Sequence, residues 1–524
     1  MNCGSRRIAG VGIGSPTPAA VNALRVRTAR FRSAGALLRS RLRPRYGADS
    51  ELRDDVARRP DGSPLPVRLR PAPWSAVFEK GALLSVLGWR RLVRQTAERA
   101  FRKDSGGGRE ILSLNRYNAA MALSHPSRRT VLRSAVQAPA AFSALSYSRI
   151  LGANERFNLG LIGAGERGRG VMMSFLKTGR VQVTAVCDVY AEMIDKVKSV
   201  APEAKGFSDH RKLLEQKDVD IVLNATPDHW HAATTIDALN AAKDVYVEKP
   251  LTLRIEEGPE IVKAARVNER VCQVGLQQRS GAHYIEAKQQ YMDTGALGKI
   301  TLVRTWWHGN MYHLRRAPAS LAAKPSNLDW ARFLGPVRWR DWDPQQFWNW
   351  RAYLDFGGGQ VTDLFTHWID VVHMFMNNDS PTSGVAAGGV YHYKDGRTAP
   401  DTINVLLEYG GQYTVTFEAT LAPGIRGYGI EFCGTKGKLF IDRSRYEFLA
   451  AERGAKPVEV KGPDYDFTLD HVKNFLDCCV SRKRPNCDVY DGHRSAMASH
   501  LGNISYVQKR RLNFDPLREE ILPL

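Results

Sequence analysis

The chain has 524 residues, a formal net charge of +21, and a hydrophobic fraction of 43%. This length exceeds one ordinary hydrophobic core, so at least two folded domains are expected. The positive charge lies almost entirely in residues 1–150, which hold 28 Lys and Arg against 9 Asp and Glu, whereas residues 151–524 hold 47 against 45. The nearly neutral remainder excludes an extended basic surface for nucleic acid on the folded body.

Residues 1–120 are predicted to be disordered. Of their 24 basic residues 22 are Arg, and these are interspersed with Pro, Gly and Ala without a sustained apolar pattern of helical or strand period. A basic tail that binds polyanions is the alternative, but the segment lacks the regular interleaving of aromatic residues expected of such tails.

Residues 121–153 are predicted to be an export signal followed by a linker. The sequence Ser127-Arg-Arg-Thr-Val-Leu-Arg133 precedes a short apolar run at 134–145 and resembles a twin-arginine signal. Such signals occupy a true N-terminus, so we expect translation to start at Met121 and the protein to be periplasmic or secreted. If this stretch is instead an ordinary N-terminal helix, a cytoplasmic location is expected. The run is too short for a permanent anchor, and no stable membrane insertion is expected.

The seven cysteines do not predict a disulfide or a metal centre. Cys187 and Cys272 fall in expected buried strands, Cys478 and Cys479 are adjacent on an expected helix, and no C-x-x-C spacing occurs. We therefore expect neither a structural disulfide nor a bound metal.

Residues 154–275 are predicted to form a dinucleotide-binding Rossmann domain, because apolar strands alternate with amphipathic helices. The strand expected at 157–162 runs into a G-x-G-x-x-G turn. In such a turn the first glycine permits the tight bend, the second lets the backbone approach a pyrophosphate, and the third allows close helix packing. The turn consists of Gly163, Ala164, Gly165, Glu166, Arg167 and Gly168.

A carboxylate at the end of the second expected strand predicts the cofactor. Asp188 follows the strand at 181–187 and lies 20 positions after Gly168, where it would accept hydrogen bonds from the adenosine ribose. A carboxylate there repels a 2′-phosphate, so NAD is expected in preference to NADP. The alternative for Asp188 is an ordinary turn at a strand end.

Two further strands, at 219–225 and 244–247, lead into Thr226-Pro-Asp-His-Trp-His231 and Glu248-Lys-Pro-Leu251. Together with Gln273-Val-Gly-Leu-Gln-Gln-Arg-Ser280, these motifs resemble the Gfo/Idh/MocA oxidoreductases, in particular their exported bacterial branch. The resemblance runs from about residue 154 to 513. It implies that the cofactor also contacts Ala164, Arg167, Thr226, Pro227, His229, His231, Glu248, Lys249 and Gln277.

The reacting centre is predicted from three residues. Lys249 follows a strand at the edge where open parallel sheets bind ligands, and the resemblance implies that it contacts the reacting oxygen. Asp363 and His367 are four residues apart and share one helical face, which Asp370 and His373 continue. A neutral His367 suits proton acceptance near pH 7, with Asp363 orienting it or the substrate. Without the resemblance, His367 would more often be a structural histidine.

Residues 276–515 are predicted to form an α+β domain with a largely antiparallel open sheet, followed by a tail at 516–524. We expect strands at 299–307, 402–408, 413–419, 428–433 and 438–441, and helices at 360–377, 467–481 and 492–509. The many Trp residues of 301–350 are expected mainly to pack in core and loops, with a sugar-stacking platform as the alternative. Arg279, His308, Tyr312 and Arg351 are polar enough to contact substrate hydroxyls. The resemblance implies pairing through the open sheet face, hence a homo-oligomer.

Three functions are compatible with these residues. The first is an NAD-dependent oxidoreductase that acts on a secondary alcohol of a sugar, cyclitol or related polyol. The second is a redox-neutral glycoside hydrolase or epimerase that uses tightly bound NAD, although the glycosidase branch of the family carries a different motif where this chain has Asp363 and His367. The third is a non-catalytic nucleotide- or sugar-binding protein, which the intact set of Lys249, Asp363 and His367 disfavours.

Overall fold

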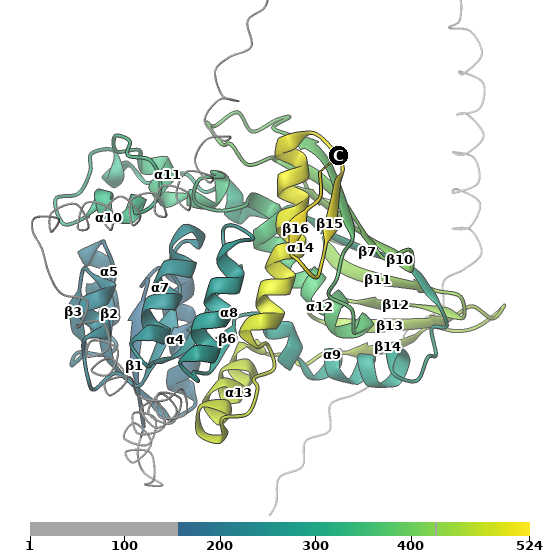
Figure 1. The fold of residues 1–524 in the computed structure, drawn as a ribbon, viewed down its shortest axis with the longest axis horizontal. Coiled ribbons are helices and arrows are strands. Elements are labelled where there is room, and N and C mark those ends of the chain that lie inside the picture. The colour runs from purple at the N-terminus through teal and green to yellow at the C-terminus, as the bar shows by residue number, and fades with distance from the viewer. Residues whose placement is uncertain (1–155, 425–426, 524) are drawn as a thin grey trace, which may run out of the picture. The chain divides into compact units, whose positions relative to one another are not determined.

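The computed structural model describes residues 156–424 and 427–523, so the predicted disordered segment 1–120 and the predicted export signal and linker 121–153 lie outside the described residues. The described chain begins with a six-stranded parallel sheet of order β3-β2-β1-β4-β5-β6 (Figure 1). Its strands are β1 Phe157–Ile162, β2 Val181–Cys187, β3 Lys205–Phe207, β4 Ile221–Asn224, β5 Asp244–Val247 and β6 Cys272–Val274. This is the strand order of a Rossmann domain, as predicted.

Helices on both faces explain why the central strands are continuously apolar. Every residue of β4 and β5 is buried, the pattern of parallel strands covered on two sides. The connecting helices are α4 Glu166–Lys177, α5 Ala191–Lys198, α6 His210–Leu214, α7 Asp228–Asn240 and α8 Glu257–Val267. The loops after β1, β4 and β5 therefore open at one edge of the sheet, where the predicted motifs lie.

The second domain contains a ten-stranded sheet of order β14-β13-β12-β11-β7-β10-β9-β8-β15-β16. All of its neighbouring strands pair antiparallel except β7 and β10, which are parallel. The strands are β7 Ile300–His308, β8 Ser383–Gly389, β9 Thr402–Tyr409, β10 Tyr413–Thr420, β11 Tyr428–Gly434, β12 Gly437–Ile441, β13 Arg445–Ala450, β14 Val458–Lys461, β15 Leu512–Asp515 and β16 Glu520–Ile521. The predicted α+β class is confirmed, and the segment set apart as a tail contains β16.

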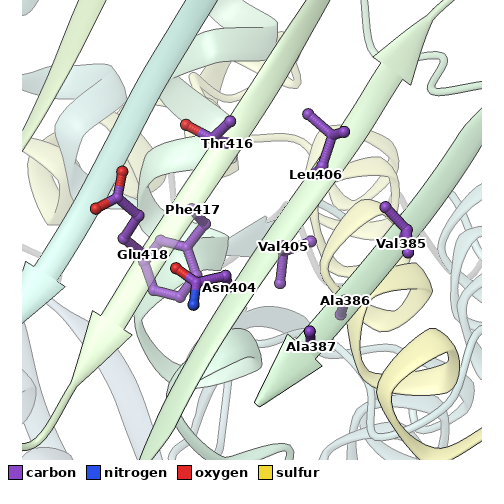
Figure 2. A pocket seen from close by; sticks show the side chains of 9 residues that line it. All are labelled: Val385, Ala386, Ala387, Asn404, Val405, Leu406, Thr416, Phe417 and Glu418. Carbon is purple, nitrogen blue, oxygen red and sulfur yellow. The ribbon is translucent and has the colours of Figure 1, made fainter. Parts of the chain in front are cut away.

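One face of this sheet is covered and the other is open. Burial alternates along β9 and β10, and the buried side chains pack against α12 Thr366–Met376 and α14 Val489–Gln508. On the open face, β8, β9 and β10 surround a hollow of about 350 Å³ (Figure 2). Its lining combines apolar side chains such as Val385 and Leu406 with Asn404, Thr416 and Glu418.

An excursion between β7 and α12 reaches back to the Rossmann domain. Tyr190 forms an isolated bridge with Leu328, and its ring belongs to an aromatic cluster with Trp330, Phe333 and Phe356. Most Trp residues of this region thus pack as expected, although Trp339 is 65% exposed and Trp348 40% exposed. The excursion contains α10 Trp330–Leu334, α11 Pro344–Trp348 and the 3₁₀ turns η4 Met311–Leu314, η5 Ala319–Leu321 and η6 Trp350–Ala352.

The last helices connect the two domains. Helix α13, Thr468–Ser481, packs against α4, and its Val472, Phe475 and Leu476 join the core of the Rossmann sheet. Helix α14 contributes to both cores. The remaining helical elements are η2 Gln277–Ser280, α9 Ala282–Ala287, η3 Lys288–Met292 and the π-helical turn η7 Val361–Phe365 that precedes α12.

Among residues 156–424 and 427–523, no helix has the length and apolarity needed to cross a bilayer. The six cysteines of the same residues carry free thiols, and only Cys433 is not fully buried. Burial raises the pKa of the Cys187 thiol above its ordinary value. The five buried cysteines pack in the apolar clusters on the two sides of the Rossmann sheet.

Candidate active site

The glycine turn after β1 has the shape of a phosphate cradle. Gly163 has a φ of +87°, and a Cβ there would lie 2.6 Å from the Ala225 backbone, while a Cβ on Gly168 would lie 2.0 Å from the Gly163 oxygen. A Cβ on Gly165 would meet no protein atom within 4 Å, so this glycine leaves open space in front of the helix. Gly165 caps α4 without any side-chain hydrogen bond, so the helix N-terminus can receive a pyrophosphate. These residues fit a dinucleotide.

Asp188 supports this turn. Its carboxylate accepts hydrogen bonds from the backbone N–H of Ala164 at 2.8 Å and of Tyr190 at 3.0 Å. Burial raises the pKa of Asp188 to about 6, against the effect of these two bonds, so the group is ionised at neutral pH. Asp188, predicted to accept hydrogen bonds from the ribose, thus also holds Ala164, the second residue of the turn, in place.

Arg167, Glu248 and Gln277 form one hydrogen-bonded cluster beside the turn. The Nε of Arg167 donates to Oε1 of the buried Glu248 at 2.8 Å. With its amide oriented to satisfy both contacts, Gln277 accepts from Nη2 of Arg167 and donates to the Gly275 oxygen at 3.1 Å. Three residues predicted from separate motifs are therefore brought together by the fold.

The two histidines after β4 hold backbone segments. His229 donates from Nε2 to the Phe333 oxygen at 2.7 Å, and the ring nitrogens of His231 lie 2.6 Å from the Pro250 oxygen and 2.8 Å from the Thr226 oxygen. His231 thereby ties the loop after β4 to the loop after β5, and Pro227 caps α7. Their direct contact with a cofactor stays a prediction, as does that of Thr226.

Lys249 meets Asp363 across the two domains. The Nζ of Lys249 donates to Oδ1 and to the backbone oxygen of Asp363, both at 2.6 Å. His313 donates from Nε2 to Oδ2 at 2.9 Å, and Nε of Arg351 lies 3.4 Å from Oδ1. Although burial opposes ionisation, Lys249 and Arg351 hold the pKa of Asp363 well below its usual range. Asp363 is thus a permanent anion that fixes the ammonium group.

Asp228 adds a second carboxyl group beside this cluster. It is 5% exposed and accepts a backbone hydrogen bond from Gly358. Burial raises its pKa to about 8, and the charge of Arg351 only partly opposes this. At pH 7 Asp228 is therefore mainly protonated, and Asp363 is the ionised member of the pair.

His367 is held as a neutral ring at the same place. Its Nδ1 donates to Oε1 of Gln278 at 3.1 Å, which leaves the lone pair on Nε2, an atom that makes no hydrogen bond with any described residue. Burial, and then the charge of Lys249, lower the pKa of His367 well below its usual range. The lowered pKa keeps the imidazole neutral near pH 7 and also makes it a weak base, so the open Nε2 accepts a proton only as the reacting oxygen releases it.

The continuation of the Asp363 and His367 face has a structural role. Asp370 accepts from Nε of Arg279 at 2.9 Å and from Ser495, and His373 hydrogen-bonds to Tyr409. Of the residues expected to contact substrate, Arg279 is thus committed to an internal ion pair. The sequence analysis did not single out Asp228, Gln278 or His313.

No group of three or more His, Cys, Asp and Glu side chains within residues 156–424 and 427–523 is placed to hold a metal ion.

Comparison with known proteins places both domains in one family. Residues 157–276 match the oxidoreductase family with an NAD-binding Rossmann fold, and residues 333–440 match the GFO/IDH/MocA C-terminal domain. Inositol 2-dehydrogenase of Salmonella typhimurium (strain LT2) is 31% identical over 162 residues, which cover 30% of this chain and 47% of that protein. Alpha-N-acetylgalactosaminidase of Shewanella oneidensis is 33% identical over 127 residues, covering 22% and 28%. The chain thus matches less than half the length of these relatives.

Solved structures share the fold at low identity. Levoglucosan dehydrogenase in complex with NADH and levoglucosan aligns with a TM-score of 0.55 and 18% identity over 68% of this chain and 99% of that one. The WlbA dehydrogenase from Bordetella pertussis in complex with NADH and UDP-GlcNAcA aligns with a TM-score of 0.54 and 19% identity over 71% and 99%. With both domain matches in order and the Rossmann turn, Lys249, Asp363 and His367 brought together, the chain belongs to the Gfo/Idh/MocA family of oxidoreductases.

Proposed function

We propose that the protein is an NAD-dependent oxidoreductase that acts on a secondary alcohol of a sugar, cyclitol or related polyol. The observation that carries the proposal is the contact of Lys249 with Asp363 beside a neutral His367, at the carboxyl edge of the parallel sheet. Ligands of open α/β sheets bind at this edge. The chemistry supplied by bound NAD is hydride acceptance from the carbinol carbon.

Residues of this chain hold the reacting oxygen and accept its proton. Lys249 donates a hydrogen bond to the reacting oxygen, and Asp363 keeps its ammonium group charged and in place. Nε2 of His367 accepts the hydroxyl proton while Gln278 fixes the ring through Nδ1. The carbinol carbon loses a hydride and the oxygen loses a proton, so the alcohol becomes a carbonyl.

The relatives support a polyol substrate. The names of the similar proteins include an inositol dehydrogenase and a levoglucosan dehydrogenase. We therefore expect NADH to form when the protein is incubated with NAD and a panel that includes myo-inositol and levoglucosan, measured by absorbance at the nicotinamide band. The absence of NADH with every polyol, from protein shown to bind NAD, would contradict the proposal.

A redox-neutral glycosidase or epimerase is the second candidate. It is favoured by the match to an alpha-N-acetylgalactosaminidase, which is confined to 22% of this chain. Release of nitrophenol from nitrophenyl N-acetylgalactosaminide without net NADH would identify this activity. Because the family resemblance implies that the glycosidase branch carries a different motif where this chain has Asp363 and His367, we place the dehydrogenase first.

Location and assembly complete the proposal. We infer export to the periplasm or the medium from the twin-arginine pattern at Ser127–Arg133, which lies outside the described residues. We also propose that a second copy covers the open sheet face around the hollow of β8, β9 and β10 (Figure 2). Cell fractionation and light scattering test these two statements separately.

A further inference from the structure

Arg443 lies in the turn between β12 and β13, with its guanidinium group against two indole rings. Its Cζ is 4.9 Å from the ring centroid of Trp307 and 6.0 Å from that of Trp368. Both Trp residues lie on the covered side of the large sheet, and the Trp307 ring centroid is 6.3 Å from that of His367. Arg443 therefore borders the same region as the proposed base.

Among residues 156–424 and 427–523, no acidic side chain forms an ion pair with Arg443, although the charge of Asp466 acts on it from beyond ion-pair distance. Its Nε is buried without a hydrogen-bond partner, and no ion pair is formed by the side chain. The other arginines near the site differ, because Arg167 pairs with Glu248 and Arg279 pairs with Asp370. The Arg443 side chain is half-buried, and a cation with a buried, unpartnered N–H is costly unless a ligand supplies an acceptor.

The charge balance of the site points in the same direction. Lys249 and Arg351 share one ionised carboxylate, Asp363, because Asp228 is mainly protonated at pH 7. Arg443 adds a further positive charge that acts on His367. At this site the cations Lys249, Arg351 and Arg443 thus outnumber the carboxylates of Asp363 and Asp466 before any substrate binds.

We propose that the substrate is an acidic sugar, in which a carboxylate carried by the ring or chain pairs with Arg443 while a secondary hydroxyl faces Lys249 and His367. The planar fork of a guanidinium matches a carboxylate, and the flanking indoles of Trp307 and Trp368 limit its approach to one edge. The inference rests on the proposed oxidoreductase function and adds the substrate class.

The experiment compares acidic and neutral sugars of the same configuration. Binding of D-galacturonate and D-galactose, and of D-glucuronate and D-glucose, is measured by calorimetry on protein saturated with NAD. We expect at least one uronate to bind more tightly than its neutral counterpart. In Arg443→Gln this preference should fall roughly 10- to 100-fold, the scale for losing a charged hydrogen bond.

The matched control is Arg445→Gln, two residues along the same hairpin. Arg445, the first residue of β13, pairs with Glu459 of β14 at 2.9 Å. Replacing Arg445 should therefore leave the preference for the uronate unchanged. Arg443→Lys, which keeps the charge and loses the fork, should retain part of the preference and guards against misfolding of the Gln variant.

Three results would overturn the inference. These are equal binding of acidic and neutral sugars by the wild type, an unchanged preference in folded Arg443→Gln, and a preference for galactose 6-phosphate over the uronates. Neutral sugars that bind and yield NADH in any of these cases would leave the oxidoreductase function standing. Failure of all of these sugars to bind would also overturn the inference, whereas the oxidoreductase function itself is decided by the polyol panel that includes myo-inositol and levoglucosan.

Discussion

The ammonium group of Lys249 lies 2.6 Å from both the carboxylate and the backbone oxygen of Asp363, a residue 114 positions later and in the other domain. The contact joins the loop after β5 to η7, so the reacting centre exists only when the two domains are packed together. Both side chains are largely withdrawn from water, with exposed fractions of 12% and 13%.

Removing Lys249, proposed to hydrogen-bond the reacting oxygen, or His367, proposed to accept its proton, should slow turnover strongly without loss of the cofactor. Lys249→Ala and His367→Ala are each expected to lower kcat by about 100-fold or more, the usual scale for such groups. NAD affinity, measured by fluorescence titration, should change little. Lys288→Ala, a half-buried lysine paired with Asp293 away from the site, serves as the control. Wild-type kcat in both site variants would place the reacting centre elsewhere.

Breaking the Lys249–Asp363 pair from one side should destabilise the fold. Asp363→Asn leaves Lys249, Arg351 and His313 without their common anion, so the free energy of unfolding is expected to fall by about 3 kcal/mol. Adding Lys249→Met should recover part of this loss, because it removes the uncompensated charge. Urea denaturation of the single and double variants measures both effects, and simple additivity of the two losses would contradict the pairing.

The parts of the site that lie next to each other in sequence could be predicted. The glycine turn, Asp188 and Lys249 each follow a recognisable apolar strand, and the ends of parallel strands meet at one edge. The Asp363 and His367 pair follows from helical spacing. Their convergence required the family resemblance, because no local pattern links η7 to β5.

The parts of the site that depend on packing between distant segments could not be predicted from the sequence. His313 is 50 positions from Asp363 and sits in a 3₁₀ turn without periodicity, and Arg443 is one residue of a hairpin turn. Strand β8 was missed because Ser-Gly-Val-Ala-Ala-Gly-Gly has little β propensity and is ordered by its neighbours. The short edge strands β14 and β16 carry too few residues for an alternating signal.

Asp228 should make stability depend on pH. In the unfolded chain this carboxyl group loses its proton near pH 4, whereas in the fold its pKa is about 8. The folded state therefore holds one more proton between these values, so the stability Asp228 contributes is complete below pH 4 and is lost as the pH rises through 8.

Relative to Asp228→Asn, the wild type should lose up to about 1.4 kcal/mol per pH unit in this window. Urea denaturation at pH 5 and 7.5 measures this, with exposed Asp195→Asn as the control. Parallel pH profiles for wild type and Asp228→Asn would exclude the effect.

Asp188 should determine the choice of cofactor. In Asp188→Ser the repulsion of a 2′-phosphate is removed, so the preference for NAD over NADP is expected to fall by about tenfold or more. In the wild type, burial places the pKa of Asp188 at about 6, so discrimination should weaken as the pH falls below 6. Dissociation constants for both nucleotides at pH 5.5 and 8 provide the test. An unchanged preference in Asp188→Ser would assign the carboxylate to the support of Ala164 alone.

The final prediction concerns retention of the nucleotide. If Ser127–Arg133 directs export of the folded protein, the protein works where no pool of free nicotinamide dinucleotide is maintained, so NAD must be bound before export and released slowly. One ion pair ties the segment after β7 to the start of α4, and we expect it to slow NAD release. Nη1 of Arg315, on the segment after β7, pairs with Glu166 at the start of α4 at 2.8 Å, and its guanidinium covers the Tyr312 ring at 3.6 Å.

We therefore expect protein purified without added nucleotide to release about one NAD per subunit on denaturation, measured by chromatography. Because the Arg315–Glu166 pair is partly exposed, Arg315→Ala should accelerate NAD release only a few-fold. Arg316→Ala removes the same charge from the adjacent exposed position and should not. A cofactor that stays bound must be regenerated in place, so after one NADH per subunit has formed, further turnover would be redox-neutral or would pass the hydride to a second substrate. Substantially less than one NAD per subunit, together with activity that requires added NAD, would identify an ordinary dissociable dehydrogenase.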